Sequence, residues 1–106
     1  MKYTKLNYEG FENYLVFFGN DLFGGIRYEF KFENRYGASV IKHIGSYGSQ
    51  YDLFELAVLK DGHLCYDTEI TDDVIGYLSN ERVIEILERI KALWFSMTSK
   101  CSNMIG

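Results

Sequence analysis

The pattern that most constrains the fold is a strict alternation of apolar and charged residues over residues 26–33. The apolar positions are Ile26, Tyr28, Phe30 and Phe32, and the charged positions between them are Arg27, Glu29, Lys31 and Glu33. Because successive side chains of a strand point to opposite faces, this pattern predicts a strand with one buried face. Turn-forming residues follow at 34–37, and a second strand-like segment at 38–44 predicts a β-hairpin.

Two further segments extend the expected sheet. Residues 53–59 are nearly all apolar, which indicates a central strand covered, at least in part, on both faces. Lys60, Asp61 and Gly62 form a tight-turn signal, after which residues 63–66 predict a short fourth strand. Residues 14–18 fit either a strand or a helical turn.

The C-terminal third predicts a helix. Ser79 is a good N-cap residue, and apolar residues recur after it at a spacing of three to four, at Val83, Ile86, Leu87, Ile90 and Leu93. Thr71 can cap an earlier helical turn, because Asp72 and Asp73 would lie at the positive end of its dipole. We therefore expect a helical segment over 71–95 and a polar tail over 96–106 that frays.

These elements define an α+β fold, an antiparallel meander of about four strands with a C-terminal amphipathic helix packed on one face. A chain of 106 residues has the length of one domain. We therefore expect a single domain over residues 1–106, in which an N-terminal segment at 1–25 precedes the antiparallel sheet at 26–66.

The charge balance points away from nucleic acid. Fifteen acidic residues against eleven basic ones give a net charge of −4, and the basic residues are scattered. Nucleic-acid binding instead relies on a concentrated basic surface. A protein with a basic surface is the more natural partner. We expect a cytoplasmic protein without a membrane partner, because no apolar run approaches about 20 residues and the N-terminus does not resemble a secretory signal.

The residues for catalysis do not form a recognisable set. His43 and His63 are the only histidines, and only Cys65 lies near one of them, too few ligands for a zinc site. No nucleophile motif and no phosphate-binding loop is present. We therefore expect no enzymatic activity, no cofactor and no metal.

Residues 67–73 form a cluster of acidic side chains, with carboxylates at Asp67, Glu69, Asp72 and Asp73. The cluster lacks the spacing and the glycine of a calcium loop, although its carboxylates could hold magnesium together with a phosphate-bearing substrate. A small metal-dependent hydrolase is therefore one alternative function. The simpler interpretation is that two of these acids serve a helix N-terminus and one lies in a turn.

The loop at 45–52 is rich in tyrosine, serine and glycine, a composition typical of recognition surfaces. It fits equally well an ordinary hairpin loop whose glycines adopt positive φ. We predict that a partner protein is contacted by two groups of residues. The first lies in the loop and the second in the acidic cluster: Tyr47, Tyr51 and Asp52, then Asp67, Glu69, Asp72 and Asp73.

Several blocks over residues 26–93 together resemble a family of short proteins encoded by bacteriophages and mobile elements. The blocks are YGASVIKH at 36–43, GSYG at 45–48, LFELAVL at 53–59, LCYDT at 64–68 and ITDDVIGYL at 70–78. The family has no established catalytic residue to carry over. The resemblance implies a phage accessory protein acting in the bacterial host, where small acidic proteins of this kind often inhibit host systems, as anti-CRISPR proteins do.

The sequence and the resemblance lead to one main expectation, a non-catalytic phage accessory protein that binds and inhibits a host protein such as a CRISPR effector. Such a protein would act as a steric or allosteric blocker. A second possibility is a self-associating structural or regulatory protein of a mobile element, a homo-oligomer with a seam through Ile84, Trp94 and Phe95.

Overall fold

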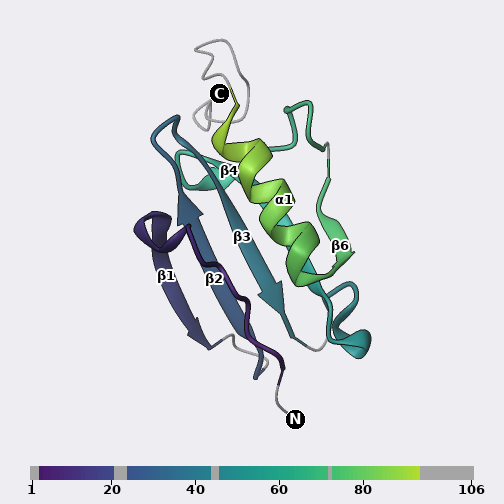
Figure 1. Cartoon of the computed structure of the whole chain (residues 1–106). Coiled ribbons are helices and arrows are strands. Elements are labelled where there is room, and N and C mark those ends of the chain that lie inside the picture. Colours follow the sequence, from purple (N-terminus) through teal and green to yellow (C-terminus); the bar gives the residue numbers. More distant parts are fainter. Residues whose placement is uncertain (1–2, 21–23, 44–45, 72, 94–106) are drawn as a thin grey trace.

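The computed structural model describes residues 3–20, 24–43, 46–71 and 73–93. In this part of the chain, an antiparallel sheet is covered on one face by the helix α1 (Asn80–Lys91) (Figure 1). The fold is therefore α+β, as the sequence predicts. Trp94 and Phe95 of the expected seam, and the expected tail at 96–106, lie outside the described residues.

The sheet follows the order β1-β2-β3-β4-β5. The remaining strand, β6, pairs with the first half of β4, whereas β5 pairs with its last two residues. Two short 3-10 helices, at Glu12–Tyr14 and Ser49–Tyr51, lie in the connections. The strands are β1 (Leu15–Asn20), β2 (Ile26–Lys31), β3 (Tyr36–Lys42), β4 (Phe54–Lys60), β5 (His63–Leu64) and β6 (Ile75–Leu78).

The alternating pattern of β2 gives the strand one buried face, as predicted. Tyr28 and Phe30 are almost fully buried beneath the covering layer, whereas Arg27 and Glu29 lie on the opposite face and stay partly exposed. The uncertain segment before it forms β1, which pairs antiparallel with β2 at the edge of the sheet. The sequence of this segment fits either a strand or a helical turn. Backbone pairing with the neighbouring strand β2 therefore determines that it forms a strand.

The helical turn expected from Thr71 is wrong. Ile75 to Leu78 form β6 instead, which pairs with β4 through Phe54 opposite Leu78 and Leu56 opposite Ile75. Pairing of this segment with β4 outweighs the local helix-capping signal of Thr71. The helix α1, by contrast, begins where the sequence predicts. The Ser79 side chain accepts a hydrogen bond from the backbone N–H of Arg82 at 3.2 Å.

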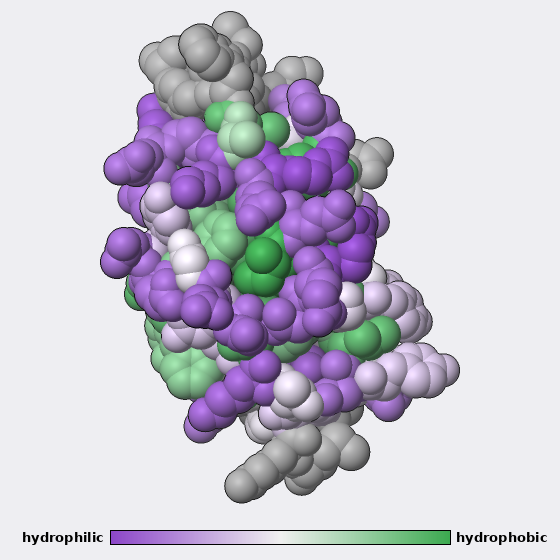
Figure 2. Space-filling model, in the orientation of Figure 1, coloured by the Kyte–Doolittle hydropathy of each residue, from purple (hydrophilic) through white to green (hydrophobic). Residues whose placement is uncertain are grey.

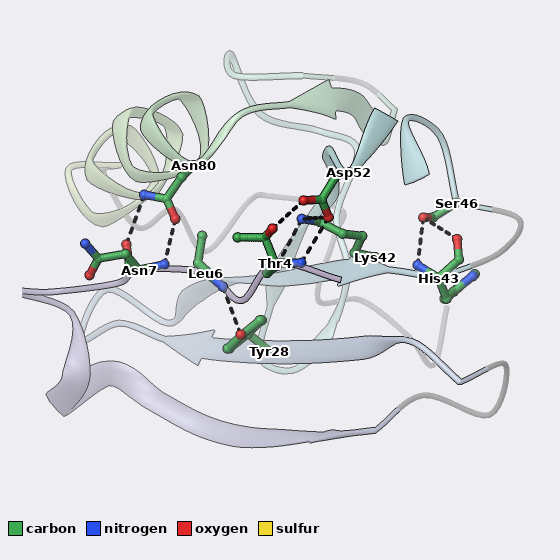
Figure 3. A network of polar contacts seen from close by, with 9 residues as sticks. All are labelled: Thr4, Leu6, Asn7, Tyr28, Lys42, His43, Ser46, Asp52 and Asn80. Carbon is green, nitrogen blue, oxygen red and sulfur yellow. Dashed lines mark hydrogen bonds and ion pairs between the residues drawn. The ribbon is translucent and has the colours of Figure 1, made fainter. Parts of the chain in front are cut away.

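The N-terminal segment shares the helix-covered face of the sheet (Figure 1). Leu6 donates its backbone N–H to the Tyr28 hydroxyl at 3.0 Å. Asn7 donates its N–H to the side chain of Asn80 at 2.6 Å, and the Asn80 amide donates back to the Asn7 carbonyl at 3.2 Å (Figure 3). Helix and N-terminal segment together cover this face, where the buried apolar side chains of β2, β3 and β4 meet those of α1.

Viewed from the helix side, the surface is mainly hydrophilic around a small apolar area (Figure 2). A hollow of about 530 Å³ lies on this side between the N-terminal segment and α1. Phe11 and Ile84 form part of its wall, together with Glu88 and Lys91. Of the helices described, none is both long and apolar enough to span a lipid bilayer.

Candidate recognition surface

Three exposed tyrosines gather at one end of the sheet. Tyr47 and Tyr51 come from the loop between β3 and β4, and Tyr77 comes from β6; their exposed fractions are 59%, 64% and 58%. The ring of Tyr77 lies 6.5 Å from that of Tyr47, with a 23° angle between the planes, and 6.4 Å from that of Tyr51. We call these three residues the tyrosine cluster.

The backbone holds the tyrosine cluster together. Tyr77 donates its N–H to the Tyr47 carbonyl at 3.3 Å. A Cβ on Gly76 would lie 2.4 Å from the Cβ of Tyr47, and a Cβ on Gly48 would lie 2.8 Å from the Cα of Tyr77. Real Cβ atoms do not approach so closely, so glycine at both positions allows the loop and β6 to touch.

Two backbone conformations add to this constraint. Gly48 has φ of +94°, and Tyr77 has φ of 60°, in the left-handed region that aromatic residues seldom adopt. A non-glycine residue keeps such a conformation only where its surroundings enforce it. Here the enforcing contacts are the pairing of β6 with β4 and the packing of Tyr77 against the loop. The described part of the loop thus has a glycine at positive φ, as an ordinary hairpin loop requires, and its Tyr47 and Tyr51 are exposed.

The loop has further internal hydrogen bonds. The N–H of Leu53 donates to the Gly48 carbonyl at 3.0 Å. At the start of the loop, the hydroxyl of Ser46 accepts from the backbone N–H of His43 at 3.0 Å and donates to its carbonyl at 2.8 Å (Figure 3). Ser46 is buried, so these bonds satisfy its hydroxyl away from water. The described part of the loop is therefore built as an ordered structure.

Asp52, predicted to contact a partner, makes its described contacts within the chain. One carboxylate oxygen, Oδ1, accepts from Lys42 Nζ at 2.9 Å and from the Thr4 N–H at 3.0 Å; the other, Oδ2, accepts from the Thr4 hydroxyl (Figure 3). Burial disfavours ionisation of Asp52, but the hydrogen bonds from Thr4 and Lys42 outweigh this effect and lower its pKa to about 2. Asp52 therefore ties the N-terminal segment to the loop.

The partner of Asp52 is a fully buried lysine. Lys42 donates to the Thr4 carbonyl at 3.0 Å as well as to Asp52, and its Nζ lies 3.8 Å from the centre of the Phe54 ring. Charged lysines are almost never fully buried unless they are paired. The hydrogen bonds and the aromatic face supply that compensation. Nothing in the alternating pattern of β3 identified this lysine as buried, because its partners come from distant segments.

One member of the acidic cluster, Asp73, is linked to the tyrosine cluster through Glu55. Asp67, Glu69 and Asp73 are exposed, and Asp72 lies outside the described residues. Asp73 accepts a hydrogen bond from the N–H of Val74 at 2.7 Å, and its charge acts on Glu55 of β4. The sequence did not single out Glu55, because it lies within a nearly continuous apolar run.

Glu55 is only partly exposed and accepts a hydrogen bond from the backbone of Tyr47. Burial raises its pKa, an effect that this hydrogen bond and nearby His43 partly offset. Glu55 therefore joins the base of the tyrosine cluster to the acidic segment before β6. In the described ranges, no three His, Cys, Asp or Glu side chains gather closely enough to hold a metal ion.

Comparisons of the chain with protein-family models, with curated protein sequences and with solved structures find no match.

Proposed function

We propose that this protein is a non-catalytic binding protein that attaches to a partner through the tyrosine cluster. One observation carries the proposal: three neighbouring tyrosines are each more than half exposed although the backbone beneath them is tightly constrained. Tyrosine supplies a large contact area at a low cost in side-chain entropy. A constrained cluster of this kind loses little further conformational freedom when a partner covers it.

Charge suggests the kind of partner. The exposed carboxylates of Asp67, Glu69 and Asp73, together with a net charge of −4, complement arginine and lysine side chains. A protein surface that normally binds nucleic acid has this basic character. In line with the phage resemblance, we propose a host protein as the partner, a CRISPR effector for example, whose basic surface is blocked sterically in the host cytoplasm. The modest charge supports a blocker better than a full imitation of DNA.

The experiment is a quantitative capture from bacterial host lysate with the tagged chain. It compares the wild type with a Tyr47→Ala, Tyr51→Ala, Tyr77→Ala triple variant. The matched control is Arg89→Ala, at an exposed position on α1. A partner retained by the wild type and the control but lost by the triple variant would support the proposal. Equal capture by all three folded proteins would refute the assignment of the tyrosine cluster.

Self-association is a second candidate, favoured by the edge strand β1. Val16, Phe17 and Phe18 are 57%, 43% and 45% exposed, and β1 contains no charged residue. Edge strands of this kind can pair with a second chain. Arg27 and Lys5 lie over the rings of Phe17 and Phe18, respectively, and cover them in part. Light scattering decides the matter: a dimer that Val16→Lys dissociates would favour self-association, and a monomer at all concentrations would exclude it.

A further inference from the structure

The sheet face opposite α1 has an apolar groove that none of the preceding assignments uses. Cross-strand pairing places Ile41 opposite Glu55 and Ser39 opposite Ala57 on this face. The segment after β4 forms the other wall, and the groove encloses about 220 Å³. Its lining residues are Ser39, Ile41, Glu55, Ala57, Leu64, Tyr66 and Val74.

The groove combines an apolar wall with one carboxylate. Leu64 and Tyr66 at the rim are 56% and 41% exposed. Glu55 is the acidic residue of the lining, and Ser39 adds a hydroxyl. The Tyr47 backbone hydrogen-bonds to Glu55 and helps to hold it in place. An occupant that matches this arrangement has an apolar stem and a positively charged end.

We propose that the groove binds one arginine side chain of the partner protein, with the guanidinium group on Glu55 and the methylene stem against Ile41, Ala57 and Leu64. This inference rests on the proposed function and names the chemistry by which the partner is held. Pockets for whole small-molecule ligands usually enclose about 300–1,000 Å³. A groove of 220 Å³ is better matched to one side chain.

Arginine fits the groove better than lysine for two reasons. Its planar guanidinium can form two parallel hydrogen bonds with a carboxylate, and it also stacks on aromatic rings such as that of Tyr66 at the rim. Partial burial of Glu55 strengthens such an ion pair compared with one in open water.

The neighbouring charges are compatible with a cation at Glu55. Asp73 adds negative charge, whereas His43 opposes it. Arg27 lies opposite Ile41 in the strand pairing but forms an ion pair of 2.6 Å with Glu29, which offsets its charge. The site is thus a carboxylate with a second acid nearby, and Arg27 on the neighbouring strand is already paired with Glu29.

The experiment titrates the full, isotope-labelled chain with an alanine-rich pentapeptide containing one central arginine and follows the backbone amide signals by NMR. The matched probe replaces arginine with citrulline, which has nearly the same shape but no charge. We expect the signals of Ala57, Leu64 and Tyr66 to shift with the arginine peptide and much less with the citrulline peptide. Equal shifts with both peptides, or shifts confined to other parts of the chain, would overturn the proposal.

Two variants sharpen the test. Glu55→Gln can still accept the hydrogen bond from Tyr47 but loses the charge, so we expect affinity for the arginine peptide to fall by about tenfold or more. Glu81→Gln, at an exposed acid on α1 that belongs to neither the groove nor the acidic cluster, should bind like the wild type. If Glu55→Gln does not fold, Leu64→Ser at the exposed rim replaces it and should weaken binding of the arginine peptide. Unchanged affinity in the folded groove variant would contradict the inference.

The two proposals can fail separately. Partner capture that depends on the tyrosine cluster, without arginine binding in the groove, would remove only the groove assignment. Arginine binding in the groove, without any effect of the tyrosine variants on capture, would remove only the role of the tyrosine cluster.

Discussion

The ion pair between Lys42 and Asp52 joins two residues in unequal environments. Lys42 is fully buried, whereas the side chain of Asp52 is 46% exposed. Loss of the acid would therefore leave a buried cation with fewer partners, but loss of the lysine would leave a carboxylate that water can reach. The cost of breaking an ion pair falls mainly on the member that stays buried and uncompensated.

Asp52→Asn should therefore destabilise the fold more than Lys42→Met. We expect the asparagine variant to lose about 2–3 kcal/mol of unfolding free energy and the methionine variant about 1 kcal/mol, because methionine keeps an apolar stem against Phe54. Urea unfolding followed by circular dichroism measures both. A larger loss in Lys42→Met than in Asp52→Asn would contradict the claim that the main cost of breaking this ion pair is an uncompensated buried lysine.

The same carboxylate predicts an acid dependence. Its pKa is about 2 in the folded protein against an ordinary value of 3.8, so the unfolded chain takes up the proton first as the pH falls. The contribution of Asp52 to stability is complete above pH 4 and is lost between about pH 4 and pH 2. Glu55, whose folded pKa is raised, contributes in the opposite sense, since its stabilising effect is lost as the pH rises.

Comparison with Asp52→Asn isolates this effect. Wild-type unfolding free energy should fall more steeply between pH 4 and pH 2 than that of the variant. Parallel curves for the two proteins in chemical unfolding across this range would contradict the assigned ion pair.

At the scale of elements, the close approach of β6 to the loop at 45–52 positions the tyrosine cluster. A Cβ on Gly76 would lie 2.4 Å from that of Tyr47, so Gly76→Ala should push the loop away from β6. We expect a loss of about 1–3 kcal/mol and a change in the NMR signals of the Tyr47 and Tyr77 rings.

Gly62→Ala is the matched control for this substitution. Gly62 has φ of +83° with open space around the added Cβ, so alanine there costs about 1–2 kcal/mol through backbone strain alone. The control should leave the tyrosine ring signals in place. Unmoved ring signals in Gly76→Ala as well would show that the contact between β6 and the loop does not position the cluster.

The elements differ in how far their sequences predict them. The alternation in β2 and the apolar spacing of α1 are local patterns, and both elements form where those patterns indicate. The segment before α1 carries a helix-capping signal, but it becomes β6 because β4 offers a free side for pairing. A local pattern does not report such a pairing, which joins residues 19 and 24 positions apart in the chain.

In the candidate site, too, local sequence identifies some residues, and contacts between distant segments determine the others. Tyr47 and Tyr51 stand out by composition, because the loop combines tyrosine with glycine and serine. Tyr77 can be assigned to the tyrosine cluster only once the position of β6 is known. The place of Glu55 in the groove likewise depends on the register between β3 and β4. The internal contacts of Asp52 likewise depend on Thr4, which is distant in sequence.

At the scale of the whole molecule, the two faces of the sheet differ. The helix and the N-terminal segment cover one face (Figure 1), and the opposite face carries the groove in which we propose that an arginine side chain binds. Glu55 connects that groove to the tyrosine cluster, since it lines the groove and accepts a hydrogen bond from Tyr47. The proposed partner therefore approaches the loop end and the open face together, away from α1.

Amide hydrogen exchange of the chain, free and bound to the captured partner, tests this account most directly. Binding should slow exchange at residues 46–51 and 75–78 and leave β1 and the exposed side of α1 unchanged. Slower exchange confined to β1 or α1, with the loop and β6 unaffected, would contradict a recognition surface built on the tyrosine cluster.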